Sequence, residues 1–169
     1  QPSENTYSNP PESTSPQLES QIASFSTKIY TKDNARQNNM QITASRLNGK
    51  IIKNGETFSF CDKTGPSTAE EGYKKATVFQ NGKKVQALGG GNCQISSTLY
   101  NAVLDISDLK VVERHEHGKK VSYVPDGKDA AVAYGSIDFK FTNNTGSRIK
   151  LYFSTDDKEV SVKIVKLFS

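Results

Sequence analysis

The stretch GGGNCQISSTLYNAVLDI, residues 89–106, decides how the rest of this chain is interpreted. Its apolar residues recur at helical spacing and predict a helix from about Asn92 to Ile106 whose buried face carries Ile95, Leu99, Ala102, Val103 and Ile106. Three consecutive glycines come directly before it. Glycine tolerates positive φ and lets another group approach the main chain closely. The run therefore predicts a special backbone path that places Cys93 in the first helical turn.

Cys93 in that position has the surroundings that a cysteine nucleophile needs. The unpaired N–H groups and the positive dipole end of a first turn favour a thiolate. The same N–H groups can hold a developing oxyanion. The alternative is a buried or disulfide-bonded cysteine after a flexible loop. Cys61 is the second of the 2 cysteines, so the two could form one disulfide or have separate fates.

The chain has 2 histidines, His115 and His117, in the segment ERHEH at residues 113–117. On a strand both imidazoles would share a face, and either could be the general base for Cys93. The order of cysteine, helix, strand-borne histidine and aspartate is that of transglutaminase-like and papain-like enzymes. Surface histidines without a role are the alternative. The carboxylates that could orient the base are those of Asp126, Asp129 and Asp138.

The same histidine pair suggests a different chemistry. Two imidazoles together with a thiolate or carboxylate make a tetrahedral metal set. No HExxH motif, CxxC pair or finger-like Cys/His spacing accompanies them. We therefore expect no metal and no cofactor, and keep the metal site as an alternative.

Residues near Cys93 supply candidate substrate-binding groups. Gln94 could donate to an oxyanion or join the thiol in a thioester-type crosslink. The hydroxyls of Ser96, Ser97 and Thr98 are typical of helix capping. The tyrosines lie at strand and helix spacing, so they either pack in the core or line a sugar or peptide groove. The residues that we predict to bind substrate are Gly90, Gly91, Gln94, Tyr123 and Arg114.

Patterns elsewhere predict an α+β fold, with two main helices packed on a mostly antiparallel sheet and a strand-rich C-terminal half. Asp33 or Asn34 begins a helix that runs to about Asn48. Asn54-Gly55 and Asn81-Gly82 are hairpin-turn pairs. A loop with at most a helical turn is expected over 61–75. Alternating patterns predict strands at 24–30, 110–116, 121–124, 130–134, 137–143, 149–154 and 159–167.

Composition bounds the domain and its partners. Residues 1–20 hold many Ser, Asn, Glu and Pro and almost nothing apolar, so we expect a disordered linker followed by one domain over 21–169. The net charge is +4, and the lysines are scattered in pairs. That pattern is typical of a solvated surface and argues against a nucleic-acid footprint. No apolar run approaches the ~20 residues that span a bilayer.

The polar start of the chain also bears on location. The sequence opens with Gln, and no signal peptide precedes the polar stretch. Such a stretch resembles the spacer that follows a removed signal or membrane anchor. We therefore expect an extracytoplasmic, cell-envelope protein that meets a membrane only through an anchor absent from this chain.

Ordered motifs over roughly residues 21–155 resemble the VanW domain, a family named from vancomycin-resistance gene clusters. The strongest match is GGGNCQ at 89–94 with SSTLYNA at 96–102. Three positions depart from the family pattern. Cys61 stands where Asn is usual, Asn92 replaces an aliphatic residue, and Gly118 replaces a common Ser. The other matches are NG at 48–49, GETFSF at 55–60, GP at 65–66, GY at 72–73, Ala76, ERHEH at 113–117, YVP at 123–125, Gly127, DA at 129–130 and YG at 134–135.

The resemblance implies an exported or membrane-anchored envelope protein, from a family without an established biochemical activity. Three hypotheses follow. The first is a cysteine enzyme of acyl transfer or amide hydrolysis on peptidoglycan, with Cys93 as nucleophile, His117 or His115 as base and Asp129 as orienting acid. The second is a non-catalytic module that binds peptidoglycan or the envelope. The third is a histidine-based metal site. We expect a monomer whose partner is peptidoglycan or a cell-wall peptide.

Overall fold

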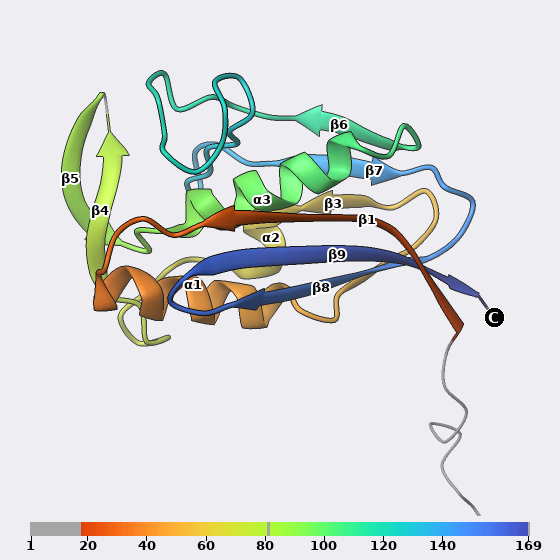
Figure 1. Ribbon diagram of the computed structural model, residues 1–169, viewed down its shortest axis with the longest axis horizontal. Helices are drawn as coiled ribbons and strands as arrows, with labels where there is room; N and C mark the ends of the chain where they lie inside the picture. The colour runs from red at the N-terminus through yellow and green to blue at the C-terminus, as the bar shows by residue number, and fades with distance from the viewer. Residues whose placement is uncertain (1–17, 81, 169) are drawn as a thin grey trace, which may run out of the picture.

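The computed structural model describes residues 18–80 and 82–168. Its largest sheet is antiparallel and has the strand order β1-β9-β8-β2. The long strand at its edge therefore pairs the beginning of the described chain with its end (Figure 1). The members of this sheet are β1 Leu18–Lys28, β2 Ile51–Ile52, β8 Ile149–Thr155 and β9 Glu159–Phe168.

A second sheet and a separate hairpin complete the strands of the described residues. The second sheet has the order β3-β7-β6, again antiparallel. The hairpin lies apart from both sheets at one edge of the molecule (Figure 1). The bounds are β3 Thr57–Ser59, β6 Leu109–Glu113 and β7 Lys140–Asn143 for the sheet, with β4 Lys75–Gln80 and β5 Lys83–Leu88 for the hairpin.

Three helices are found in the described part of the chain: α1 Asn34–Leu47, α2 Phe60–Thr64 and α3 Asn92–Leu104. Asp33 caps α1, because its side chain accepts a hydrogen bond from the N–H of Arg36 at 3.1 Å. Helix α3 runs between the two larger sheets, against β1 and β9 on one side and β6 on the other (Figure 1). None of these helices is long and apolar enough to cross a membrane.

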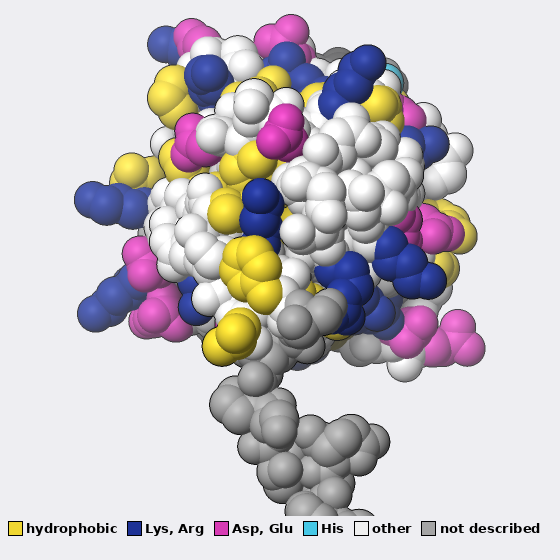
Figure 2. All heavy atoms as spheres, turned by 90° about the vertical axis from the view of Figure 1, so that its right-hand side faces the viewer, with side chains coloured by type: hydrophobic (Ala, Val, Ile, Leu, Met, Phe, Trp, Pro, Cys, Tyr) yellow, Lys and Arg dark blue, Asp and Glu magenta, His cyan; other side chains and the backbone are white. Residues whose placement is uncertain are grey.

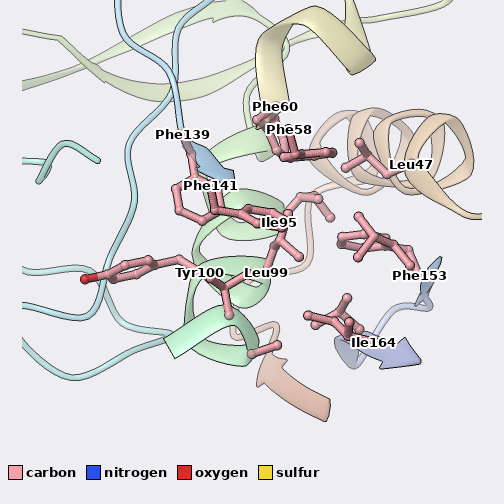
Figure 3. Packing of buried hydrophobic residues seen from close by; sticks show 14 of the residues in the cluster. Leu47, Phe58, Phe60, Ile95, Leu99, Tyr100, Phe139, Phe141, Phe153 and Ile164 are labelled. Atoms are coloured by element: carbon pink, nitrogen blue, oxygen red, sulfur yellow. The ribbon is translucent and has the colours of Figure 1, made fainter. Parts of the chain in front are cut away.

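The core lies where α3 meets both sheets and α1 (Figure 3). Phe58 of β3 and Phe141 of β7 stack with ring centroids 5.0 Å apart. Ile95 and Leu99 of α3 reach the same cluster and are fully buried, as the helical spacing predicts. Each such side chain contributes about 1.5–3 kcal/mol on burial, so α3 is anchored firmly. The start of that helix is thereby fixed in space.

The predicted α+β class with antiparallel sheets is confirmed, and so are both long helices and the second hairpin. The Asn54-Gly55 hairpin is wrong, because β2 pairs with β8 and β3 pairs with β7. The strands predicted at 121–124 and 130–134 are absent, with only an isolated bridge at Ala133. Strand β1 starts at Leu18, within the expected linker, whose other residues 1–17 lie outside the described residues.

Surface charges on the face away from the hairpin are mixed in sign. Figure 2 shows Lys and Arg side chains there interspersed with Asp and Glu. The described residues on this face form no broad basic patch (Figure 2). The face therefore agrees with the scattered lysines noted in the sequence. Mixed charges of this kind are typical of a solvated surface.

Candidate functional site

The triple glycine sets the start of α3 by close packing. Gly91 is the N-cap residue and has φ of 110°, a left-handed conformation that favours glycine. A Cβ on Gly91 would lie 2.8 Å from Met40 Cγ, and one on Gly90 would lie 2.7 Å from the carbonyl carbon of Ala76. The glycines therefore let α1 and β4 approach the main chain. This confirms the special backbone path and places Cys93 second in the helix.

Cys93 faces a backbone segment that arrives from much later in the sequence. The N–H of Val132 approaches Cys93 Sγ at 3.4 Å, and Sγ lies 3.4 Å from the carbonyl oxygen of Val132. The thiol is partly exposed and is not in a disulfide. The Val132 N–H can donate to a thiolate, whereas the Val132 carbonyl oxygen can accept from a thiol. The sulfur is thus held in place by both backbone groups of one residue.

His117 and Asp129 form the next two members of the site. His117 Nδ1 lies 2.5 Å from Asp129 Oδ2, and the backbone N–H of His117 donates to the same oxygen at 2.7 Å. The side chains are 6% and 8% exposed, so the pair is shielded from water. With Nδ1 held by the carboxylate, the imidazole is fixed in orientation and Nε2 is left for another partner.

The charges around His117 link it to Cys93. Burial alone would lower the pKa of His117, but hydrogen bonding and charge attraction from Cys93 and Asp129 outweigh it and raise that pKa above its ordinary value. Burial likewise would raise the pKa of Asp129, yet its hydrogen bonds with His117 lower it. The surroundings of His117 therefore favour its positively charged imidazolium form, with the Asp129 carboxylate as the anion beside it.

A polar stripe on α3 holds the segment that carries Asp129. Ser97 Oγ accepts from the N–H of Ala130 at 2.8 Å, and Ser96 Oγ donates to the carbonyl oxygen of Ala130 at 2.5 Å. Asn101 Nδ2 donates to the carbonyl oxygen of Lys128 at 2.8 Å. All three side chains are buried and bind a distant segment, so Ser96 and Ser97 are structural anchors and not the helix caps that we predicted for them.

Arg114 secures the other side of the same segment. Its guanidinium donates to the carbonyl oxygens of Asp129 and Gly127, each at 2.8 Å, and lies over the ring of Tyr100 with Cζ 4.9 Å from the centroid. Arg114 does not line the cavity described below. The predicted substrate contact is therefore replaced by a role in holding the Asp129 loop.

The second histidine lies in a different environment. His115 Nε2 is 2.8 Å from Glu113 Oε2, and its side chain is 40% exposed. Residues 114–117 are not in a strand, so the shared face expected for the two imidazoles does not form. Within the described part of the chain, no group of three or more potential metal ligands comes together. Of the two histidines, only His117 joins Cys93 at the site.

The other cysteine, Cys61, lies near Cys93 in surroundings that disfavour its thiolate. It is buried, is not in a disulfide, and its Sγ approaches the carbonyl oxygen of Ile137 at 3.5 Å. Burial and the neighbouring Asp138 carboxylate raise the pKa of Cys61 to about 12. Asp138 accepts from Ser59 and from the backbone of Cys61, so it belongs to this second cluster and not to the His117 pair. Asp126 is 70% exposed and also lies apart.

Cys93, His117 and Asp129, here called the triad, lie beside a cavity of about 1210 Å³. Cys93 and His117 line it together with Tyr123, Gly91 and residues of the β4–β5 hairpin. Phe79 of the hairpin meets the His117 ring edge to face, with centroids 6.4 Å apart. Burial raises the pKa of Tyr123, so its hydroxyl stays protonated and can donate a hydrogen bond. Gly90 is buried under Ala76 and does not line the cavity.

Gln94 is committed to protein contacts. Its Nε2 donates to Thr27 Oγ1 at 2.9 Å and to the carbonyl oxygen of Lys28 at 3.0 Å. Its Oε1 accepts from Arg36 Nη2 at 2.8 Å. Both amide hydrogens are therefore used, which leaves none for the oxyanion contact that we predicted. Arg36 was not singled out in the sequence, because nothing local distinguishes one arginine on a polar helix face.

The sequence of this chain matches a known protein family over most of its length. The family described as "VanW like protein" matches residues 35–165. The chain belongs to the VanW family. The matched range contains Cys93, His117 and Asp129, as well as the anchors that hold them. The resemblance noted in the motifs is thus confirmed.

Two curated relatives support this assignment. An uncharacterized protein YoaR of Bacillus subtilis (strain 168) is 38% identical over 123 residues, which cover 73% of this chain and 40% of that protein. The vancomycin B-type resistance protein VanW of Enterococcus faecalis (strain ATCC 700802 / V583) is 33% identical over 127 residues, covering 72% and 46%. The chain spans less than half the length of both relatives. No solved structure matches it.

Proposed function

We propose that this chain is the catalytic part of an exported cell-envelope enzyme that transfers or hydrolyses acyl groups of peptidoglycan peptides. The observation that carries the proposal is the 2.5 Å contact between His117 Nδ1 and Asp129, on an imidazole that also interacts with Cys93. A thiol, an imidazole and an orienting carboxylate are the parts of an activated nucleophile. Cys93 and His117 lie on a cavity wall, which gives a substrate access to sulfur.

The proposed reaction follows from these positions. His117 takes the proton of Cys93, and the thiolate attacks the carbonyl carbon of an amide. The C–N bond then breaks, and His117 returns the proton to the departing amine, which leaves a thioester on Cys93. Water or a second amine attacks the thioester with His117 as base, giving hydrolysis or transpeptidation. The first-turn N–H of Cys93 and the Tyr123 hydroxyl are the proposed donors to the oxyanion.

The envelope setting and the substrate class are supported by the composition of the chain and by one relative. The polar stretch at residues 1–17 resembles a spacer after an anchor, and one relative carries the name of a vancomycin resistance protein. Peptidoglycan peptides are amides that occur in that setting. We therefore propose that the partner is a peptidoglycan peptide, that the protein is located in the cell envelope and that it is a monomer. The choice of substrate is tested first.

The test is incubation of the protein with soluble muropeptides, followed by mass spectrometry of the products and of the protein. Wild type and Cys61→Ala should form the same shortened or crosslinked products. Cys93→Ala should lose the reaction by more than ~10³-fold, because the nucleophile is gone. Cys61 is the matched control, since it is the second thiol near the cavity. Product formation by Cys93→Ala would overturn the proposal. Binding to sacculi by both proteins without any product would favour the non-catalytic module.

A further inference from the structure

Among the charged side chains that line the cavity, Arg36 lies close to Cys93 and has no role in the triad. Arg36 lies in the first turn of α1, and its side chain reaches the cavity wall. Its stem packs against the start of α3, because a Cβ on Gly91 would lie 3.1 Å from Arg36 Cγ. Its Nη2 donates to Gln94 at 2.8 Å. The stem of Arg36 thus packs on Gly91 and its guanidinium is held by Gln94, the residues on either side of Asn92-Cys93.

The contacts of this guanidinium are neutral. Besides Gln94, Nη1 approaches Met40 Sδ at 3.5 Å. No carboxylate in residues 18–80 or 82–168 forms an ion pair with Arg36, although Asp33 attracts it from a distance. Burial outweighs the opposing attraction of neighbouring acidic groups and lowers the pKa of Arg36. A guanidinium has five donors, so most of them remain available to a ligand.

Such an arrangement is costly without an anion. A partly buried cation whose direct contacts are neutral loses hydration that no ion pair replaces. Gln94 fixes its direction, since the amide is itself locked by Thr27 and Lys28. A planar guanidinium in a fixed orientation matches the two oxygens of a carboxylate. The cavity therefore holds a preformed site for a carboxylate close to the nucleophile.

We propose that Arg36 binds the free C-terminal carboxylate of a peptide substrate and directs Cys93 to the last peptide bond. The inference rests on the proposed function, because it requires Cys93 to be a nucleophile. Cys93 attacks the carbonyl carbon of the penultimate residue, and the terminal amino acid leaves with a proton from His117. Its carboxylate stays on Arg36 until release. Water or an acceptor amine then takes the acyl group from sulfur.

The test compares two alkylating reagents of nearly equal size on the full chain. Iodoacetate carries a carboxylate, whereas iodoacetamide is neutral. The ratio of their rates at Cys93 should favour iodoacetate in wild type and fall about tenfold in Arg36→Met, which keeps the stem but loses the charge. Arg36→Lys should retain part of the preference. Lys119→Met is the matched control, because Lys119 is a second cation on the cavity wall and its ammonium is bound to the carbonyl oxygen of Gly82 at 3.0 Å.

A measurement on the unaltered protein keeps the proposal testable if Arg36→Met does not fold. N-acetyl-alanyl-alanine in its L,L and D,D forms is added during iodoacetamide labelling, beside the matching C-terminal amides. At least one free acid should slow the labelling of Cys93, and its amide should not. Rapid labelling of Cys93 without any acid preference in either experiment would overturn the Arg36 proposal and leave the nucleophile intact. Slow labelling by both reagents would overturn the nucleophile itself.

Discussion

At the scale of single residues, His117 is the proposed general base and also affects the stability of the fold. Its side chain is nearly buried, and its neighbours favour the charged imidazole. A group whose pKa is raised on folding stabilises the native state fully below its unfolded pKa, near 6.5 for histidine. That contribution is lost as the pH rises through the raised native pKa. His117 is therefore expected to stabilise the native state most at mildly acidic pH.

This predicts a pH dependence of the unfolding free energy. The difference between wild type and His117→Asn should decrease as the pH rises above about 6.5, because wild type alone loses the stabilisation of its imidazolium. Urea unfolding at a series of pH values from about 5.5 to 9 measures it. A difference that stays constant or grows with pH would show that the neighbours of His117 do not raise its pKa.

Asp129 provides a second prediction at this scale. Asp129→Asn preserves the size of the side chain but removes its negative charge. The pKa of His117 should fall, because burial remains while one source of attraction is lost. NMR titration of the imidazole protons measures this. Asp126→Asn is the control, since Asp126 is exposed and forms an ion pair with Lys120 at 3.9 Å. Equal shifts in both variants would contradict the role of Asp129.

At the scale of elements, the glycine run is a packing device between β4 and α3. A Cβ on Gly90 would lie 2.7–2.8 Å from three atoms of Ala76, two of them in the main chain. Gly90→Ala should therefore destabilise the protein by about 1–3 kcal/mol, because the hairpin must shift. Urea unfolding measures this. Gly127→Ala is the comparison, since its positive φ adds strain but nothing lies within 4 Å of the new Cβ. A smaller loss for Gly90→Ala than for Gly127→Ala would contradict the packing argument.

The helices and the hairpin could be predicted because their signals are local. The stripe through Ile95 and Leu99 and the glycines before Cys93 mark α3 directly. The Asn54-Gly55 pair predicts a hairpin that does not form, because β2 and β3 pair with strands of different sheets. Tertiary pairing determines the strand register here, and the local turn sequence does not. The segment 114–139 has few regular elements. Its position depends on side chains of α3 such as Ser97, which look like caps in the sequence.

At the scale of the whole molecule, the site lies where distant segments meet. The start of α3 supplies Cys93, the irregular segment supplies His117 and Asp129, and α1 brings Arg36 to the same cavity. The roles of Cys93, His117 and Asp129 were proposed from residue type and order alone. Arg36 could not be, because its relation to Gln94 arises only when α1 packs beside α3. Local patterns carry no information on that contact.

The central claim is that His117 and Asp129 activate Cys93, and thiol labelling tests it most directly. The native protein is treated with iodoacetamide near pH 7, and both cysteines are quantified by peptide mass spectrometry. Cys61 is the internal reference, since its thiol is buried and its pKa is raised to about 12. Cys93 should be labelled at least about tenfold faster than Cys61 and should slow markedly in His117→Ala. Labelling of Cys93 at the same rate in wild type and His117→Ala would contradict the account.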